Sequence, residues 1–252
     1  MTKILAITNQ KGGVGKTTTS VNLAASLAST GKQVLLIDLD PQANATMGSG
    51  TNKQTVQQTV YQVLLGEIPI KDARVDNLQA KYDLIPANRD LAGAEIELVT
   101  LSLREKRLKT ALSEIAEEYH YVIIDCPPAL NLLTLNGLCA ADAVMIPMQC
   151  EYYALEGLSD LVNTIKKVRT NFNPTLRIEG LLRTMFDPRN ILAQQVSDQL
   201  QQHFGNKVYR TVIPRNVRLA EAPGFGIPVL YHDRQSKGAQ AYLELAKEIL
   251  SV

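Results

Sequence analysis

The chain of 252 residues has few cysteines and no long apolar run. Its three cysteines, Cys126, Cys139 and Cys150, are odd in number and lack C-x-x-C spacing, which favours reduced thiols over a disulfide framework or a zinc site. No stretch approaches the roughly 18 consecutive apolar residues that a membrane span needs. The N-terminus runs directly into an apolar strand pattern, so we expect no signal peptide. Low-complexity tracts, repeats and linkers are also lacking, and we expect a single α/β domain over residues 1–252, located in the cytoplasm.

The charged residues are nearly balanced in number but unevenly distributed along the chain. The formal net charge is +1, yet residues 163–218 contain ten Lys or Arg and three Asp or Glu, which gives this segment +7 and leaves −6 for the rest. A basic segment inside a nearly neutral protein is typical of a surface that binds a polyanion. A solvated basic face without a partner is the alternative interpretation.

The most informative stretch is the glycine-rich sequence TNQKGGVGKTTT at residues 8–19. It follows an apolar run at 4–7 and precedes apolar positions at helical spacing that begin near Lys16 and end near Gly31. A glycine-rich turn between a strand and a helix is the context of a phosphate-binding P-loop. There, backbone amides and the helix N-terminus bind phosphate oxygens, while Lys16 adds a charge near the β- and γ-phosphates and Thr17 ligates Mg²⁺. The predicted nucleotide contacts are Lys11, Gly12, Gly13, Val14, Gly15, Lys16, Thr17 and Thr18.

Two further apolar runs end in acids. Residues 34–37 are followed by Asp38 and Asp40, and residues 121–124 by Asp125. Ligands of open α/β sheets bind beyond the carboxyl ends of the strands, so these carboxylates suit Mg²⁺ binding or the positioning of a water molecule. Asp125 is expected to hold Mg²⁺ through a water, as the strand-end acid of P-loop NTPases does. Alone, acids that follow a strand also suit a turn or a helix N-cap, and the preceding P-loop favours the metal interpretation.

A second lysine in the loop makes the resemblance specific. Lys11 opens the motif Lys-Gly-Gly-Val-Gly-Lys-Thr-Thr, which resembles the deviant Walker A box of the ParA/MinD family of ATPases. The stretch VLLIDLDPQANAT resembles the family's second nucleotide box, with Ala43 where glycine is usual, and Asp-Cys-Pro-Pro at 125–128 resembles its switch segment. The resemblance implies that Lys11 reaches the partner's nucleotide across a dimer, that Asp40 orients the attacking water, and that Asp38 supports the water shell of the metal.

The C-terminal third extends the resemblance. Residues 214–223 resemble the segment that flanks the adenine, which makes Pro214 and Asn216 candidate base contacts. Arg189 and Arg218 fall on positions where chromosome-type ParA proteins, also called Soj, bind DNA without sequence preference. Arg183 interrupts an otherwise apolar strand; an inward arginine would need a partner, and we expect it instead at the exposed end of that strand.

The fold implied is a doubly wound, mostly parallel sheet of about seven or eight strands with helices on both faces. The function implied is a slow ATPase that uses ATP and Mg²⁺, forms a homodimer when ATP is bound, and binds double-stranded DNA non-specifically on the nucleoid. A ParB-type partner would stimulate hydrolysis and thereby drive chromosome or plasmid partitioning. No DNA-reading domain precedes the first strand, which favours the chromosome type.

Four other functions were weighed. A MinD-like membrane ATPase would end in a basic amphipathic helix, whereas the polar face of residues 239–250 carries Glu244, Lys247 and Glu248, so we expect no membrane partner. A nitrogenase-type reductase needs cysteines in glycine-rich loops for an iron–sulfur cluster. A metabolic ligase or kinase would need a substrate motif that is not evident, and an ATP-binding scaffold without hydrolysis is disfavoured by Asp40.

Overall fold

The computed structural model describes residues 2–77 and 79–251, so residues 1, 78 and 252 of the expected domain lie outside the described residues. Its centre is one eight-stranded sheet in the order β3-β4-β2-β5-β1-β6-β7-β8. Neighbouring strands are parallel except for β3, which pairs antiparallel with β4 at one edge. The expected doubly wound, mostly parallel sheet is confirmed. The strands are β1 (Lys3–Ile7), β2 (Val34–Asp38), β3 (Val75–Asn77), β4 (Tyr82–Ile85), β5 (Tyr121–Asp125), β6 (Ala143–Gln149), β7 (Arg177–Phe186) and β8 (Val208–Pro214).

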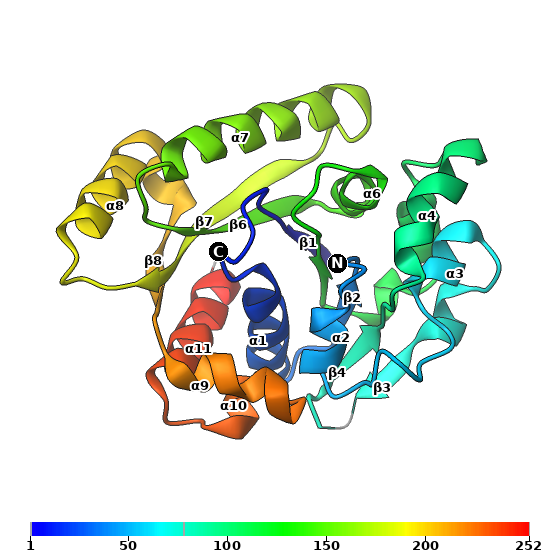
Figure 1. Ribbon diagram of the computed structural model, residues 1–252, viewed down its shortest axis with the longest axis horizontal. Coiled ribbons are helices and arrows are strands. Elements are labelled where there is room, and N and C mark those ends of the chain that lie inside the picture. The colour runs from blue at the N-terminus through cyan, green and yellow to red at the C-terminus, as the bar shows by residue number, and fades with distance from the viewer. Residues whose placement is uncertain (1, 78, 252) are drawn as a thin grey trace.

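Helices cover both faces of the sheet (Figure 1). The helices α1, α10 and α11 pack on one face over a core that includes Leu23, Leu36 and Tyr242. The opposite face carries α3 to α8 over a second core that includes Leu64, Ile124 and Leu161. The α-helices are α1 (Lys16–Ala28), α2 (Asn44–Gly48), α3 (Val60–Leu65), α4 (Leu91–Glu97), α5 (Arg107–Leu112), α6 (Leu132–Ala140), α7 (Ala154–Asn171), α8 (Ile191–Phe204), α9 (Val217–Glu221), α10 (Val229–His232) and α11 (Lys237–Leu250). Short 3₁₀ turns are η1 (Ile70–Ala73), η2 (Leu98–Thr100), η3 (Ala116–Glu118), η4 (Gly205–Lys207) and η5 (Ala222–Phe225).

The inner strands are apolar because both of their faces are buried. All five residues of β2 are buried, and so are four of the five in β5, which leaves no solvated face for polar side chains. The acids Asp38 and Asp125 are the last residues of these two strands. The strand pattern therefore brings both carboxylates to one edge of the sheet.

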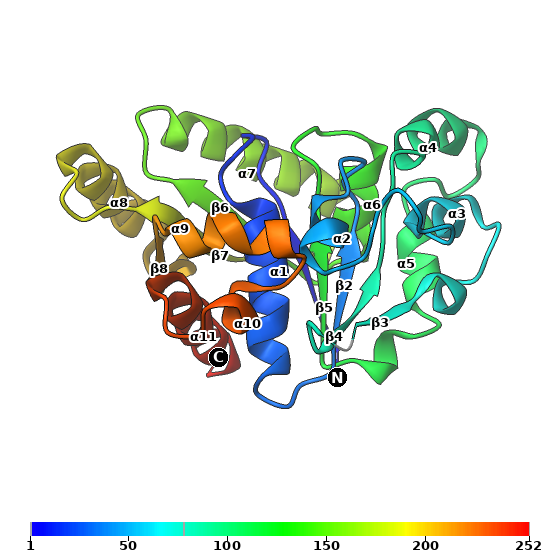
Figure 2. The same cartoon turned by 60° about the horizontal axis from the view of Figure 1, so that its bottom comes forward.

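The position of β1 decides where a ligand can bind. After β1 the chain builds the half of the sheet that contains β2, β4 and β3, and later it builds the other half from β6, β7 and β8. The strand order thus reverses beside β1, and ligands of such sheets bind at this point, beyond the carboxyl ends of the strands. The glycine-rich loop leaves β1 at this end, and Figure 2 shows α1 following it on the same side of the sheet as α9, α10 and α11.

Two helices differ from their expected bounds. The spacing of residues 104–118 predicts one long helix, but the structure has α5 followed by the separate turn η3, with Ile115 between them outside helical geometry. The spacing of residues 55–65 predicts a helix that in fact begins at Val60, because Thr59 and Gln62 form a capping box there. None of the helices within residues 2–77 and 79–251 is long and apolar enough to cross a membrane.

Candidate active site

The glycine-rich loop has the backbone of a phosphate cradle. Gly13 and Gly15 adopt φ values of +74° and +88°, a region that a side chain disfavours, and Gly15 is the residue that precedes α1. Within the described residues, the amides of Gly13, Val14 and Gly15 donate no hydrogen bond to the protein. These amides and the N-terminus of α1 are therefore available to an anion.

Lys16 lies inside this loop rather than on its surface. Its side chain is 7% exposed, and its Nζ donates a hydrogen bond to the Lys11 carbonyl oxygen at 3.0 Å. Burial lowers the pKa of Lys16, and the charges of Asp125 and Asp40 oppose that shift. A partly desolvated ammonium close to free amides is suited to a phosphate chain, which would replace the carbonyl as its partner.

Asp38 and Asp125 are paired directly across the β2–β5 ladder, and both are fully buried. Asp125 accepts hydrogen bonds from the hydroxyls of Thr17 and Ser20, each at 2.8 Å. Asp38 accepts from the amide and the hydroxyl of Thr46 at 2.8 and 2.7 Å. Burial, followed for Asp125 by the charge of Asp38, raises the pKa of both carboxyls well above the usual range. The two acids lie next to the phosphate cradle, and a bound cation would favour their charged forms.

This site has the oxygen donors that Mg²⁺ uses when it binds together with a nucleotide. No cluster of three or more Asp, Glu, His or Cys occurs in the described chain, so the protein itself offers no complete metal cage. Mg²⁺ is normally held by one or two protein groups together with phosphates and water. Thr17 and Asp125 fit that requirement, while the bonds from Thr46 and from the Asp40 amide to Asp38 favour a supporting role for this carboxylate.

A pocket of about 470 Å³ extends from the cradle. It brings together most of the predicted loop contacts, Asp40, the strand end at Thr184 and Met185, and part of the segment after Ile213. The loop residues on its wall are Gly12, Gly13, Gly15, Lys16, Thr17 and Thr18, whereas the side chain of Val14 is buried elsewhere. The predicted base contacts Pro214 and Asn216 lie on its wall. The Asn216 side-chain oxygen is buried without a hydrogen-bond partner, which leaves one acceptor unused beside the pocket.

Lys11 occupies a different environment from Lys16. About half of its side chain is exposed, and its Nζ forms an ion pair with Glu151 of the same chain, just beyond β6. The structure therefore places Lys11 beside the cradle and away from its centre. Sequence reasoning did not single out Glu151, because it is 140 residues from Lys11 and belongs to no motif.

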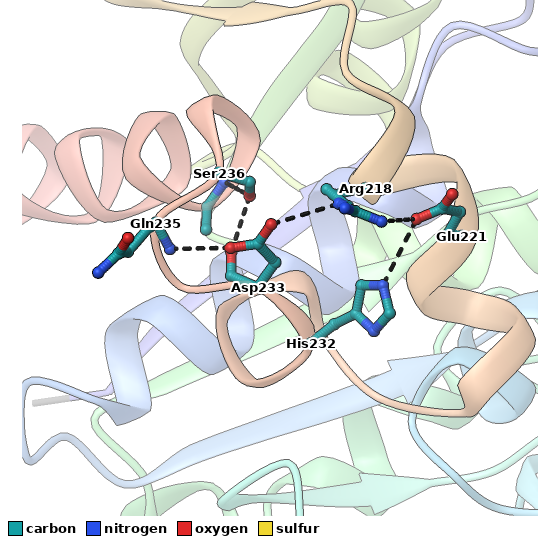
Figure 3. A network of polar contacts seen from close by, with 7 residues as sticks. Arg218, Glu221, His232, Asp233, Gln235 and Ser236 are labelled. Atoms are coloured by element: carbon teal, nitrogen blue, oxygen red, sulfur yellow. Dashed lines mark hydrogen bonds and ion pairs between the residues drawn. The ribbon is translucent and has the colours of Figure 1, made fainter.

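The two predicted DNA-binding arginines lie on the surface, and both are paired with acids. The Arg189 guanidinium binds both oxygens of Asp187, at 3.0 and 2.8 Å. Arg218 on α9 contacts Glu221 at 2.7 Å and Asp233 at 3.3 Å, and His232 lies 3.6 Å from the same Glu221 oxygen. Figure 3 shows Arg218 between these two carboxylates.

The expectation for Arg183 is wrong. This arginine is 9% exposed, and its guanidinium donates to Ser197 Oγ at 2.8 Å and to the Tyr209 carbonyl oxygen at 2.7 Å. It therefore ties β7 to β8 and α8 from inside the fold, and it contributes little to the basic surface counted from the sequence. A buried charge is tolerated only when surrounding groups form hydrogen bonds with it. The groups that do so here, Ser197 and Tyr209, are distant from Arg183 in the sequence.

The cysteines agree with the expected reduced state. Cys126, Cys139 and Cys150 are free and buried. Burial raises the pKa of the Cys126 thiol, which keeps it protonated and makes it a packing group rather than a nucleophile.

The chain was compared with known proteins. Residues 2–178 match the family described as an AAA domain. The chain is 56% identical over 249 residues to the sporulation initiation inhibitor protein Soj of Bacillus subtilis, which covers 99% of this chain and 98% of that protein. It is 53% identical over 251 residues to the chromosome partitioning protein ParA of Caulobacter vibrioides, with 99% and 94% covered.

A solved structure extends the similarity to three dimensions. The structure described as cobyrinic acid a,c-diamide synthase from Mycobacterium smegmatis, with bound ADP and magnesium, has a TM-score of 0.87 and 40% identity, covering 99% of this chain and 94% of that one. Sequence identity is higher to the two partitioning proteins, and the similarity spans the phosphate cradle, the paired acids and the C-terminal pocket wall. The chain belongs to the ParA/Soj family of chromosome-partitioning ATPases.

Proposed function

We propose that this partitioning ATPase is a DNA-binding switch driven by ATP and Mg²⁺. In the proposed cycle the ATP-bound chain forms a homodimer on double-stranded DNA, without reading its sequence. A ParB-type partner stimulates hydrolysis, and the ADP-bound or empty chain leaves the DNA. The cargo is a chromosome or a plasmid, and the protein works on the nucleoid in the cytoplasm as a single ATPase domain.

The observation that carries the nucleotide part is the continuity of one pocket. The amide cradle, Lys16, Asp40 and the wall at Pro214 and Asn216 line the same hollow, which suits a phosphate chain at one end and a base at the other. Gly12 to Thr18 would bind the phosphates, and Pro214 and Asn216 at the other end of the pocket would contact the base. The ADP and magnesium bound by the M. smegmatis relative support the same assignment.

Hydrolysis follows from the charges around the cradle. Negative charge spreads over the γ-phosphoryl oxygens in the transition state, and Lys16 together with the partner's Lys11 would neutralise it. Asp40 lies at the pocket wall with its Oδ1 accepting from the Gln42 amide at 2.9 Å, which leaves its other oxygen for the attacking water. Thr17, and Asp125 through a water, would hold Mg²⁺, which would supply positive charge to offset that of the phosphates. Asp38 would hold the metal's water shell.

The DNA part rests on Arg189, Arg218 and the basic segment around them. Binding through phosphate neutralisation gives affinity that falls by about 0.9 log unit per log unit of salt for each contact. Salt dependence, and indifference to sequence, are therefore the properties to measure.

The decisive experiment measures binding to unrelated duplex DNA with ATP, ADP or no nucleotide at several salt concentrations, with anionic liposomes in parallel. We expect tight, salt-sensitive DNA binding with ATP alone and no liposome binding. The double variant Arg189→Ala with Arg218→Ala should keep its basal ATPase rate, lose DNA binding and lower the salt slope by about two.

A matched control removes two exposed cations elsewhere, Lys71→Ala with Lys109→Ala, and should bind DNA as the wild type does. Binding of the arginine variant as tightly as wild type would overturn the assignment of the basic face. ATP-dependent binding to liposomes without DNA binding would instead support a MinD-like function.

A further inference from the structure

Residues at the ends of β6 and β7 form hydrogen bonds with the phosphate loop. Thr184, near the end of β7, is 2% exposed, and its Oγ1 donates a hydrogen bond of 2.7 Å to the carbonyl oxygen of Val14. The two residues are 170 positions apart in the sequence. We propose that Thr184 is a positioning residue for the ATPase, which turns the Val14–Gly15 peptide so that its N–H is directed at the phosphates. This inference rests on the proposed nucleotide site.

The geometry of the peptide bond links this contact to the cradle. In a planar trans peptide the C=O and the following N–H point in opposite directions. Thr184 holds the Val14 carbonyl oxygen toward the end of β7, so the Gly15 N–H points away from β7. That N–H has no partner in the described protein, as a group reserved for a ligand requires.

A second contact acts on the preceding peptide. Gln149 at the end of β6 donates through Nε2 to the Gly13 carbonyl oxygen at a longer 3.5 Å. Gln149 and Thr184 are opposite each other in the β6–β7 ladder, so adjacent strand ends hold adjacent loop carbonyls. By the same geometry, the Val14 N–H then points away from Gln149 and toward the cradle.

The loop needs such support because of its glycines. Gly13 and Gly15 permit many backbone conformations, so without restraint their peptides can rotate and the amides lose their common direction. When the loop is already ordered, the free energy of ordering it no longer opposes nucleotide binding or stabilisation of the transition state. Met185, directly after Thr184, has φ +49° beside a register shift in the strand, and such a conformation persists only where its surroundings impose it.

The test compares Thr184→Val with Thr184→Ser. Valine keeps the shape but removes the donor, and serine keeps the donor. We expect Thr184→Val to bind ADP and ATP about tenfold more weakly by titration calorimetry, and to lower kcat by a further few-fold. Thr184→Ser should restore both. The ³¹P resonance of the β-phosphate in bound ADP should shift in Thr184→Val and return in Thr184→Ser, which loss of stability alone would not cause.

Thr59→Val is the matched control, because it also removes a buried threonine hydroxyl but at the cap of α3, away from the pocket. It should lower stability and leave ADP affinity and the ³¹P resonance unchanged. Wild-type affinity and an unshifted resonance in Thr184→Val would overturn the inference. If the wild-type protein itself bound no ADP, the proposed nucleotide site would fail instead.

Discussion

At the scale of single residues, the site contains two buried carboxylates that lower the stability of the folded protein. Asp38 and Asp125 are fully buried and adjacent across two strands, and no lysine or arginine forms an ion pair with either of them in the described chain. Lys16 is the nearest compensating charge for Asp125. Such an arrangement costs stability in the absence of a cation and is retained where function requires it.

The pH dependence of stability follows from the raised pKa of this pair. An unfolded Asp loses its proton near pH 3.8, whereas burial keeps a proton on the folded pair to higher pH. The folded state then binds more protons than the unfolded state above about pH 4, so its free energy of unfolding falls as the pH rises toward neutrality. Without nucleotide or metal, we expect this contribution to make the protein less stable at pH 8 than at pH 6.

Asp125→Asn tests this argument at one residue. The variant removes one of the two charges and keeps an oxygen acceptor for Thr17 or Ser20. At pH 8, without ligand, we expect it to be about 1–3 kcal/mol more stable than wild type, with a smaller difference at pH 6. Urea unfolding at both pH values measures the effect.

The same variant should lose the stabilisation that MgATP gives to the wild type, because a metal-supporting carboxylate is gone. Asp160→Asn, an exposed acid on α7 outside the site, is the control and should match wild type throughout. A destabilised Asp125→Asn protein at pH 8 would contradict the argument.

At the scale of secondary-structure elements, α9 connects the two proposed binding sites. Leu219 and Ala220 of this helix line the nucleotide pocket. Arg218, the residue before Leu219, forms ion pairs with Glu221 and Asp233. The Arg218 guanidinium is paired with both carboxylates (Figure 3). A phosphate of DNA must compete with the two carboxylates for the charge of Arg218.

Removing these acids should therefore strengthen DNA binding when no nucleotide is bound. For Glu221→Gln with Asp233→Asn we expect DNA affinity to rise by about threefold to tenfold without nucleotide, since exposed ion pairs are individually weak. With ATP the increase should be smaller if α9 already releases Arg218. Fluorescence anisotropy with labelled duplex DNA at fixed salt measures the DNA affinity without nucleotide and with ATP.

A double-mutant cycle separates this effect from a general change in charge. Adding Arg218→Ala should abolish the gain if the acids act through that arginine. Asp198→Asn removes an exposed acid of α8 that forms no ion pair with Arg218, and it should change DNA affinity less. An equal gain in Asp198→Asn would show that net charge alone is responsible.

At the scale of the whole molecule, the lysine assigned to the dimer is turned toward its own chain. Lys11 pairs with Glu151, and about half of each side chain is exposed to solvent. Such an exposed pair is weak and can be exchanged for a more strongly charged partner. The triphosphate of a second chain would be such a partner, so assembly should depend on ATP rather than on the protein alone.

We therefore expect the oligomeric state of the protein to depend on which nucleotide is bound. We expect Asp40→Ala to keep ATP binding and to stop turnover, so this variant should sediment as a dimer with ATP and as a monomer with ADP. Lys11→Ala in the same background should remain monomeric with ATP, whereas Lys32→Ala, at a half-buried lysine remote from the loop, should not alter the dimer. Analytical ultracentrifugation gives the masses, and an ATP-dependent dimer of the Lys11→Ala protein would refute the role of Lys11.

Much of the fold and of the site could be predicted from the sequence, because the patterns that indicate them lie within short, contiguous stretches. The apolar runs before Asp38 and Asp125 are contiguous strands, and the P-loop residues from Gly12 to Thr18 are consecutive. Steric limits on the backbone and the periodicity of burial act over a few residues, so they leave a readable pattern. The predicted parallel sheet agrees with the structure for this reason.

The remaining features depend on contacts between distant segments. The donor from Thr184 to Val14, the ion pair of Lys11 with Glu151 and the burial of Arg183 each join residues that no motif connects. Thus the sequence by itself determined the family, the phosphate loop and the acids at the strand ends. Only the tertiary structure decided which side chains hold that loop and which charges are paired, because packing of remote strands and helices sets those distances.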